Sequence, residues 1–280
     1  MQLTMEQYQA IPALSAGGAW ILSELCPALY WAQSPLNPSR LPTKNTTEFD
    51  IGTACHLAIL EPHEYAERVF HIPHDSYRTK EARDLRDMAY VGKQTPLKPA
   101  EVAIVDGVRD AILRRADVAR LFTGGSAETS ITWTMDDVPC KCRPDYVSGG
   151  TILDLKTVAC AHPSVIKRAS ESHGWFVRDV WYREGVAVGA PHLLPESGAL
   201  RYWFVCVEKE PPYLIEVYEC TERARTAGEK IVGRALRLFR AFREVGRWPG
   251  YNQVIPAPLD RPVWAEYAFA DREEAGEFRR

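Results

Sequence analysis

The sequence lacks a surplus of either charge and any apolar run long enough to cross a membrane. Its 34 Lys and Arg residues against 37 Asp and Glu residues give a formal net charge of −3. No overall positive field therefore attracts nucleic acid, and any contact with DNA must use local cationic patches. The segment Met1–Gln7 has no cationic and apolar export signal, and the most apolar early stretch, residues 16–32, is interrupted by Glu24 and Pro27. We expect a soluble, cytoplasmic protein that makes no contact with membranes.

The sequence also lacks the even number of cysteines that is typical of a disulfide-bonded protein, since it has seven. An odd number of cysteines without an export signal favours reduced thiols. Only Cys140 and Cys142 are close in sequence, and no second pair of Cys or His completes the ligand set of a zinc or iron–sulfur site. We therefore interpret these two residues as buried thiols of a strand.

The spacing of apolar residues predicts a helical first half and a second half in which strands alternate with helices. The predicted helices cover residues 18–33, 51–60, 62–70, 80–91, 99–121, 163–188 and 221–245. The predicted strands cover residues 127–134, 140–147, 151–158, 202–207 and 213–218. The first three strands would form a meander, and no internal repeat or long linker separates domains.

A tight hairpin is predicted at Ser148-Gly149-Gly150-Thr151, because a Gly-Gly pair suits the positive φ values of a two-residue loop. This register places Asp145 opposite Asp154. It also places Arg143 opposite Lys156, so that four charged side chains share one face. Like charges at opposite positions destabilise a sheet, and another interaction must offset their repulsion.

Two explanations fit these four charges. In the first, Asp145 pairs diagonally with Lys156 and Arg143 pairs with Asp154, which gives a surface square of salt bridges without further function. In the second, a divalent cation lies between the two carboxylates, with Lys156 beside a metal-bound water. The local sequence leaves both explanations open.

Short strings along the chain occur in an order that resembles a known nuclease family. Arg143-Pro144-Asp145, followed after eight residues by Asp154-Leu155-Lys156, is similar to the PD-(D/E)XK nuclease signature. The wider set of strings is Pro27-Ala28-Leu29-Tyr30, Gly52-Thr53-Ala54-Cys55-His56, Leu60-Glu61-Pro62, Ala127-Glu128, Cys142-Arg143-Pro144-Asp145, Asp154-Leu155-Lys156-Thr157 and Trp248-Pro249. Together they are similar to the RecE-type exonucleases (exonuclease VIII) of phages and prophages, from about Pro27 to Trp248.

The resemblance implies an active site in which His56, Asp145 and Asp154 hold Mg²⁺, which Mn²⁺ can replace. Lys156 would deprotonate or orient the attacking water, or stabilise the developing negative charge. Glu128 is a further candidate for the catalytic group. Its alternation with polar neighbours also fits a merely solvated face of the strand.

The helix after the third predicted strand departs from the family pattern. Where the resemblance implies Gln-x-x-x-Tyr, this chain has Arg178-Asp179-Val180-Trp181-Tyr182. Tyr182 matches and is a candidate catalytic residue, and Arg178 lies one helical turn away on the same face. Arg178 and Arg143 are candidate contacts to DNA phosphates. Arg178 would also place a cation where the family has a neutral amide.

The predicted fold class is α+β, with a mixed central sheet flanked by helices in a single domain of residues 1–280. Residues 1–125 would form a mainly helical section that contributes His56, residues 126–250 the nuclease core and residues 251–280 a C-terminal tail.

The resemblance further implies degradation of linear double-stranded DNA from its ends, in the 5′ to 3′ direction, by a ring-like homo-oligomer. The product would be a 3′ single strand for a single-strand annealing protein. Two alternatives stay open, a catalytically silent DNA-binding module of the same fold and an endonuclease of the same superfamily.

Overall fold

The structure, a computed structural model, describes residues 3–41, 45–251, 256 and 258–278. The chain divides into two compact units, Met1–Trp248 and Pro249–Arg280. Residues 252–255, 257 and 279–280 of the predicted C-terminal tail lie outside the described residues. Among the helices of the described ranges, none has both the length and the apolar character that crossing a membrane requires.

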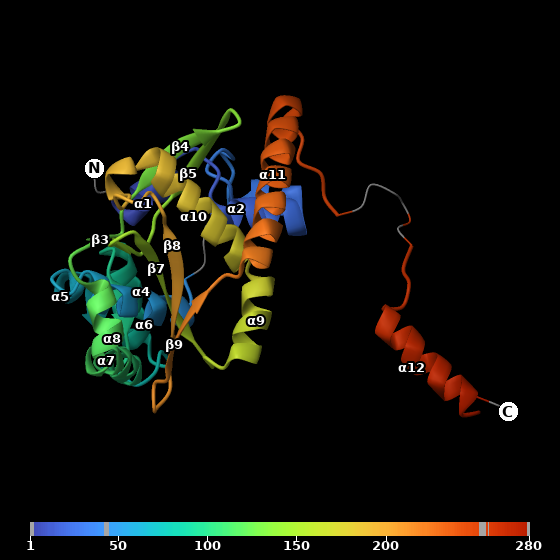
Figure 1. The fold of residues 1–280 in the computed structure, drawn as a ribbon. Helices are drawn as coiled ribbons and strands as arrows, with labels where there is room; N and C mark the ends of the chain where they lie inside the picture. The colour runs from blue at the N-terminus through green and yellow to red at the C-terminus, as the bar shows by residue number, and fades with distance from the viewer. Residues whose placement is uncertain (1–2, 42–44, 252–255, 257, 279–280) are drawn as a thin grey trace. The chain divides into compact units, whose positions relative to one another are not determined.

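A mixed five-stranded sheet with the order β3-β6-β7-β8-β9 forms the centre of the larger unit (Figure 1). The strands are β3 (Ser126–Ala127), β6 (Tyr146–Ser148), β7 (Thr151–Val158), β8 (Arg201–Glu208) and β9 (Ile215–Glu219). Strands β7 and β8 are parallel, and the other neighbours are antiparallel. A parallel pair needs a long crossover, which α9 (Pro163–Ser172) and α10 (Trp175–Gly189) provide.

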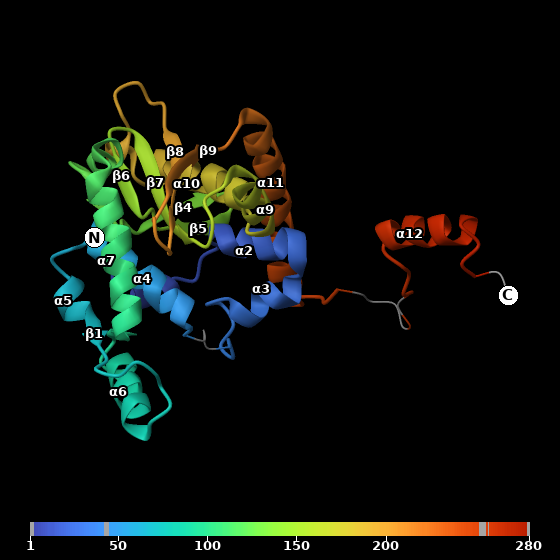
Figure 2. The same ribbon diagram turned by 90° about the horizontal axis from the view of Figure 1, so that it is seen from below.

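Helices cover both faces of this sheet (Figures 1 and 2). Helices α4 (Thr47–Leu60), α7 (Pro99–Arg114) and α8 (Ala116–Ala119) share one buried cluster with the sheet. The other cluster joins the sheet to α2 (Ala16–Trp20), α10 and α11 (Glu222–Val245). Because successive strand residues point to opposite faces, Leu153 and Leu155 belong to the first cluster and Ile152 to the second. The predicted α+β class, a mixed sheet flanked by helices, is confirmed.

The other elements of the described chain are short. They are α1 (Met5–Ala10), a π-helical segment (Ile21–Leu25), α3 (Pro27–Gln33), α5 (Tyr65–Arg68), β1 (Val69–His71), α6 (Lys80–Val91), β2 (Thr95–Leu97), 3₁₀ turns at Arg120–Phe122 and Pro191–Leu193, β4 (Ile131–Met135), β5 (Val138–Cys142) and α12 (Val263–Glu274). Strands β1 and β2 pair in parallel, and β4 and β5 form a separate antiparallel pair.

The predicted three-stranded meander is wrong, because two of its strands are each divided between two sheets. Predicted strand 127–134 becomes β3 and β4, and predicted strand 140–147 becomes β5 and β6. The second break falls at Pro144, which has no backbone N–H for a strand ladder.

Three predicted helices are also interrupted, namely 18–33, 99–121 and 163–188, since apolar periodicity does not reveal a short break.

Candidate active site

The tight turn between β6 and β7 sets the register of the candidate site. Gly149 and Gly150 have φ values of +54° and +78°, as the mirror-image turns of two-residue hairpins require. Ser148 pairs with Thr151, and Tyr146 pairs with Leu153. The predicted hairpin and its register are confirmed.

The predicted square of four charges does not form. Strand β6 begins at Tyr146, so Arg143 and Asp145 lie before the paired residues. Arg143 donates through Nε to Glu128 Oε2 at 2.7 Å and does not lie opposite Lys156. Asp145 accepts a hydrogen bond from the backbone N–H of Leu155, at 2.8 Å.

Glu128 reaches the site because the pairing of β3 with β6 continues one residue further. Its backbone N–H donates to the carbonyl oxygen of Asp145 at 3.0 Å. The φ of Glu128 is +48°, a left-handed conformation that is uncommon for residues other than Gly and often marks functional sites. The side chain is buried and holds Arg143, which also donates to the Leu3 carbonyl and the Ser130 hydroxyl. Glu128 is therefore not on a solvated strand face.

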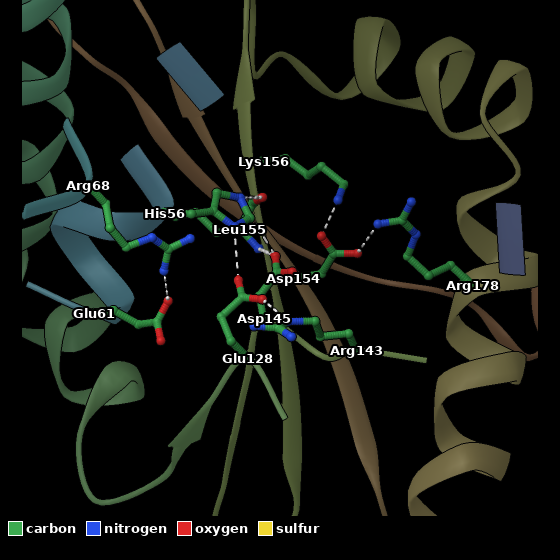
Figure 3. A network of polar contacts seen from close by, with 10 residues as sticks. All are labelled: His56, Glu61, Arg68, Glu128, Arg143, Asp145, Asp154, Leu155, Lys156 and Arg178. Carbon is green, nitrogen blue, oxygen red and sulfur yellow. Dashed lines mark hydrogen bonds and ion pairs between the residues drawn. The ribbon is translucent and has the colours of Figure 1, made fainter. Parts of the chain in front are cut away.

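Helix α4 brings His56 to the two carboxylates (Figure 3). Its Nδ1 lies 3.7 Å from Glu128 Oε1, and its Nε2 lies 3.8 Å from Asp145 Oδ2. Nε2 also lies 3.0 Å from the carbonyl oxygen of Leu155. A carbonyl can only accept, so this contact places a proton on Nε2 and directs Nδ1 toward Glu128. The peptide units of Leu155 thus orient both His56 and Asp145.

Burial and neighbouring charges shift the pKa values of these three residues. Burial raises the pKa of Asp145 to about 6, with His56 acting in the opposite direction and Asp154 adding to the rise. Burial disfavours the imidazolium form of His56, but Asp145 and Glu128 outweigh burial and raise the pKa of His56 to about 9. Burial likewise opposes ionisation of Glu128, yet the nearby His56 and the hydrogen bond from Arg143 hold its pKa below the ordinary value.

Asp154 lies in a different environment, surrounded by donors. It forms ion pairs through Oδ1 with Lys156 and through Oδ2 with Arg178, the latter at 3.3 Å. The Tyr202 hydroxyl donates to Oδ2 at 2.7 Å. Asp154 is 1% exposed, and although burial would raise its pKa, Lys156 and Arg178 hold that pKa well below the usual range.

The residues present fit a divalent metal ion at one position. One ligand atom from each of His56, Glu128 and Asp145 lies within 4.8 Å of the others. An imidazole and two carboxylates form a donor set suited to Mn²⁺ and related ions, and the carboxylate oxygens also suit Mg²⁺. The predicted set shares His56 and Asp145 with this cluster. The third residue of the cluster is Glu128, whereas the predicted third metal ligand was Asp154.

Of the remaining predicted residues, Lys156 and Arg178 contact Asp154, and Tyr182 lies beside Arg178. The Arg178 guanidinium lies 5.9 Å from the ring centre of Tyr182, and the Tyr182 ring meets the Tyr202 ring edge to face at 5.8 Å. Sequence reasoning missed Tyr202. A usable signal existed, because a tyrosine in an otherwise apolar strand needs a partner for its hydroxyl.

Comparison with known proteins agrees with this architecture. Residues 20–255 match the model of a family described as a PDDEXK-like domain of unknown function, DUF3799. A search of curated proteins finds no match.

Among solved structures, a protein from Eubacterium rectale described as a "putative exonuclease" is 15% identical, with a TM-score of 0.61. The alignment covers 96% of this chain and 99% of that chain. A second structure, of the protein SSO0001, is 15% identical over 71% of this chain and 87% of that chain, but its TM-score of 0.30 is too low to support an argument. The alignment with the first structure shows the fold alone. Because the family model spans most of the chain, the chain belongs to the PDDEXK-like family DUF3799, within the PD-(D/E)XK nuclease superfamily.

Proposed function

We propose that the chain is a metal-dependent exonuclease of the RecE type, acting on linear double-stranded DNA. The observation that carries the proposal is the cluster of His56, Glu128 and Asp145 ligand atoms directly beside Asp154-Leu155-Lys156 on a superfamily fold. Digestion in the 5′ to 3′ direction would leave a 3′ single strand for an annealing protein. In this proposal the enzyme works in the cytoplasm of a bacterial or phage-infected cell.

The chain's own residues have distinct tasks in this proposal. A bound divalent ion would supply an activated water and neutralise charge on the attacked phosphate. Glu128 and Asp145 supply the negative charge that holds the ion, and the Leu155 carbonyl accepts from His56 Nε2 and so directs Nδ1 toward Glu128. Lys156, whose side chain is 20% exposed, orients the water or stabilises the developing negative charge.

Arg143 has contacts that suit a positioning residue better than a contact to DNA. It is 8% exposed, and Glu128, Leu3 and Ser130 engage its guanidinium. Arg178 is more accessible, with 32% of its side chain exposed. In our proposal Arg143 holds Glu128 in place, and Arg178 is the better of the two candidates for a phosphate contact.

An assay with two substrates tests the proposal. Linear duplex labelled at the 5′ or 3′ end and covalently closed circular duplex are incubated with Mg²⁺, Mn²⁺ or EDTA. We expect loss of the linear substrate only, dependence on metal, and early release of the 5′ label. Asp145→Asn should lower the rate at least about 100-fold, because changes merely behind a ligand already cost 10–100-fold. Asp87→Asn, at an exposed position on α6, is the matched control and should leave the rate unchanged.

Other outcomes identify the alternatives. Cleavage of circular DNA indicates an endonuclease of the same superfamily. DNA binding without degradation in any metal indicates a catalytically silent module, a possibility favoured by the pairing of Arg178 with Asp154. Light scattering tests the ring-like assembly: particles of more than two chains support it, and a monomer contradicts it.

A further inference from the structure

The candidate site has two groups of carboxylates, Glu128 with Asp145 and, separately, Asp154. Arg178 neutralises the second of these, Asp154. Its side chain extends from the first turns of α10 toward Asp154, which it meets opposite Lys156 (Figure 3). The Tyr182 ring one helical turn away flanks the guanidinium. The position of Arg178 is therefore set by an ion pair at one end and an aromatic ring beside it.

The carboxylate of Asp154 has little capacity for a metal ion in this arrangement. A carboxylate offers about four acceptor positions. Lys156 uses one on Oδ1, while Arg178 and Tyr202 use two on Oδ2. Two of these three donors are cations, and a divalent ion at Asp154 would have to approach both of them closely.

The charge around the other carboxylates is different. Glu128 and Asp145 are two carboxylates close to each other, and Arg143 forms an ion pair with Glu128. Asp154, by contrast, is a single carboxylate that forms ion pairs with two cations, Lys156 and Arg178. The two halves of the site therefore have opposite preferences for a cation.

We propose that the guanidinium of Arg178 takes the place of a second divalent ion, so that the chain holds one ion, at the His56–Glu128–Asp145 cluster, and Asp154 is not among its ligands. This inference rests on the proposed function, since it describes the metal content of the same site. Arg178 is then a positioning residue that neutralises Asp154 and keeps Lys156 and Asp154 in place without a metal ion.

Counting bound Mn²⁺ per chain tests the inference without any DNA. Calorimetric titration, with free Mn²⁺ followed by electron paramagnetic resonance, should give one ion for the wild-type protein. Arg178→Gln, which removes the charge and keeps a hydrogen-bonding amide, should give two. Arg178→Lys keeps the charge and is the matched control, for which we expect one ion.

Two further variants keep the test informative if Arg178→Gln does not fold. Asp154→Asn should change the Mn²⁺ dissociation constant less than tenfold, because Asp154 is not a ligand. Asp145→Asn should weaken binding more than tenfold or abolish it. Circular dichroism confirms that each variant is folded.

The outcomes separate this inference from the proposed function. Two ions in the wild-type protein, or one ion in folded Arg178→Gln, would overturn the inference and leave the nuclease proposal standing. A loss of binding in Asp154→Asn equal to that in Asp145→Asn would do the same. No bound Mn²⁺ in the wild-type protein would contradict the metal-dependent nuclease itself.

Discussion

Lys141 shows how one buried side chain fastens the N-terminal segment to the fold. Its Nζ donates to the carbonyl oxygens of Tyr8, Gln9 and Ile11 at 3.0, 3.1 and 2.8 Å. These carbonyls lie at the C-terminal end of α1, where a cation is favourable. Since the neighbouring Arg143 donates to the Leu3 carbonyl, the same segment is joined to the residue that holds Glu128.

Replacing Lys141 with methionine should therefore destabilise the protein and free its N-terminal segment. We expect the free energy of unfolding to fall by about 2–3 kcal/mol, because three carbonyls lose the donor that the buried Lys141 supplies. Urea denaturation measures this change, and limited proteolysis should show earlier cleavage before Ile11.

Lys93→Met is the matched control. Lys93 contacts the same helix through an ion pair with Glu6, but both side chains are exposed, and such pairs contribute little. Equal stability of the two variants would show that the Lys141 contacts do not anchor α1.

At the scale of elements, α10 and α11 pack closely at one glycine. A Cβ added to Gly228 of α11 would lie 2.5 Å from the carbonyl oxygen of Phe176 in α10. A Cβ added to Gly233 of the same helix would meet only the end of Arg237, at 3.6 Å. The close approach of the two helices therefore requires a glycine at position 228, whereas position 233 has room for a side chain.

Alanine at these two positions should change stability in opposite directions. Overpacking costs about 1–3 kcal/mol and exceeds the gain of about 1 kcal/mol in helix propensity. Gly228→Ala should therefore lower the melting temperature, whereas Gly233→Ala should raise it slightly. Thermal unfolding of both variants measures this. A stabilised Gly228→Ala variant would contradict the close approach of the helices.

For the whole molecule, the residues up to Trp248 carry the described core. The Trp248 ring stacks on Trp31 with centres 5.3 Å apart and also contacts the rings of Tyr30, Phe239 and Phe242. Among the described residues after Gly250, none is buried. Most of the apolar burial that stabilises the fold therefore precedes residue 249.

A chain that ends at Tyr251 should accordingly keep the stability and Mn²⁺ binding of the full chain. Trp248→Ala in the full chain should lower the free energy of unfolding by about 3 kcal/mol, because a large aromatic contact is lost. Urea denaturation compares the two proteins. A shortened chain that is as unstable as Trp248→Ala would show that the C-terminal residues contribute to the fold.

Local patterns in the sequence predict much of this molecule. The Gly149-Gly150 turn and the register of β7 against β6 follow from local composition and periodicity, and the mixed sheet follows from the resemblance to the nuclease family. Contacts between distant segments do not. The hydrogen bond from Tyr202 to Asp154 spans 48 positions, and the pairing of Glu128 with Arg143 requires the left-handed turn at Glu128 that splits a predicted strand. Such contacts depend on how the elements pack, which periodicity alone does not specify.

Because the Leu155 backbone contacts both His56 and Asp145, the candidate site can form only during folding. That backbone meets His56 from α4 and Asp145 from the preceding hairpin arm, so those two side chains are aligned only once β7 has docked between them. A nascent or partly unfolded chain therefore lacks the aligned donors and should not capture an ion there. In a cell, this arrangement would keep the candidate metal centre unassembled until folding is complete.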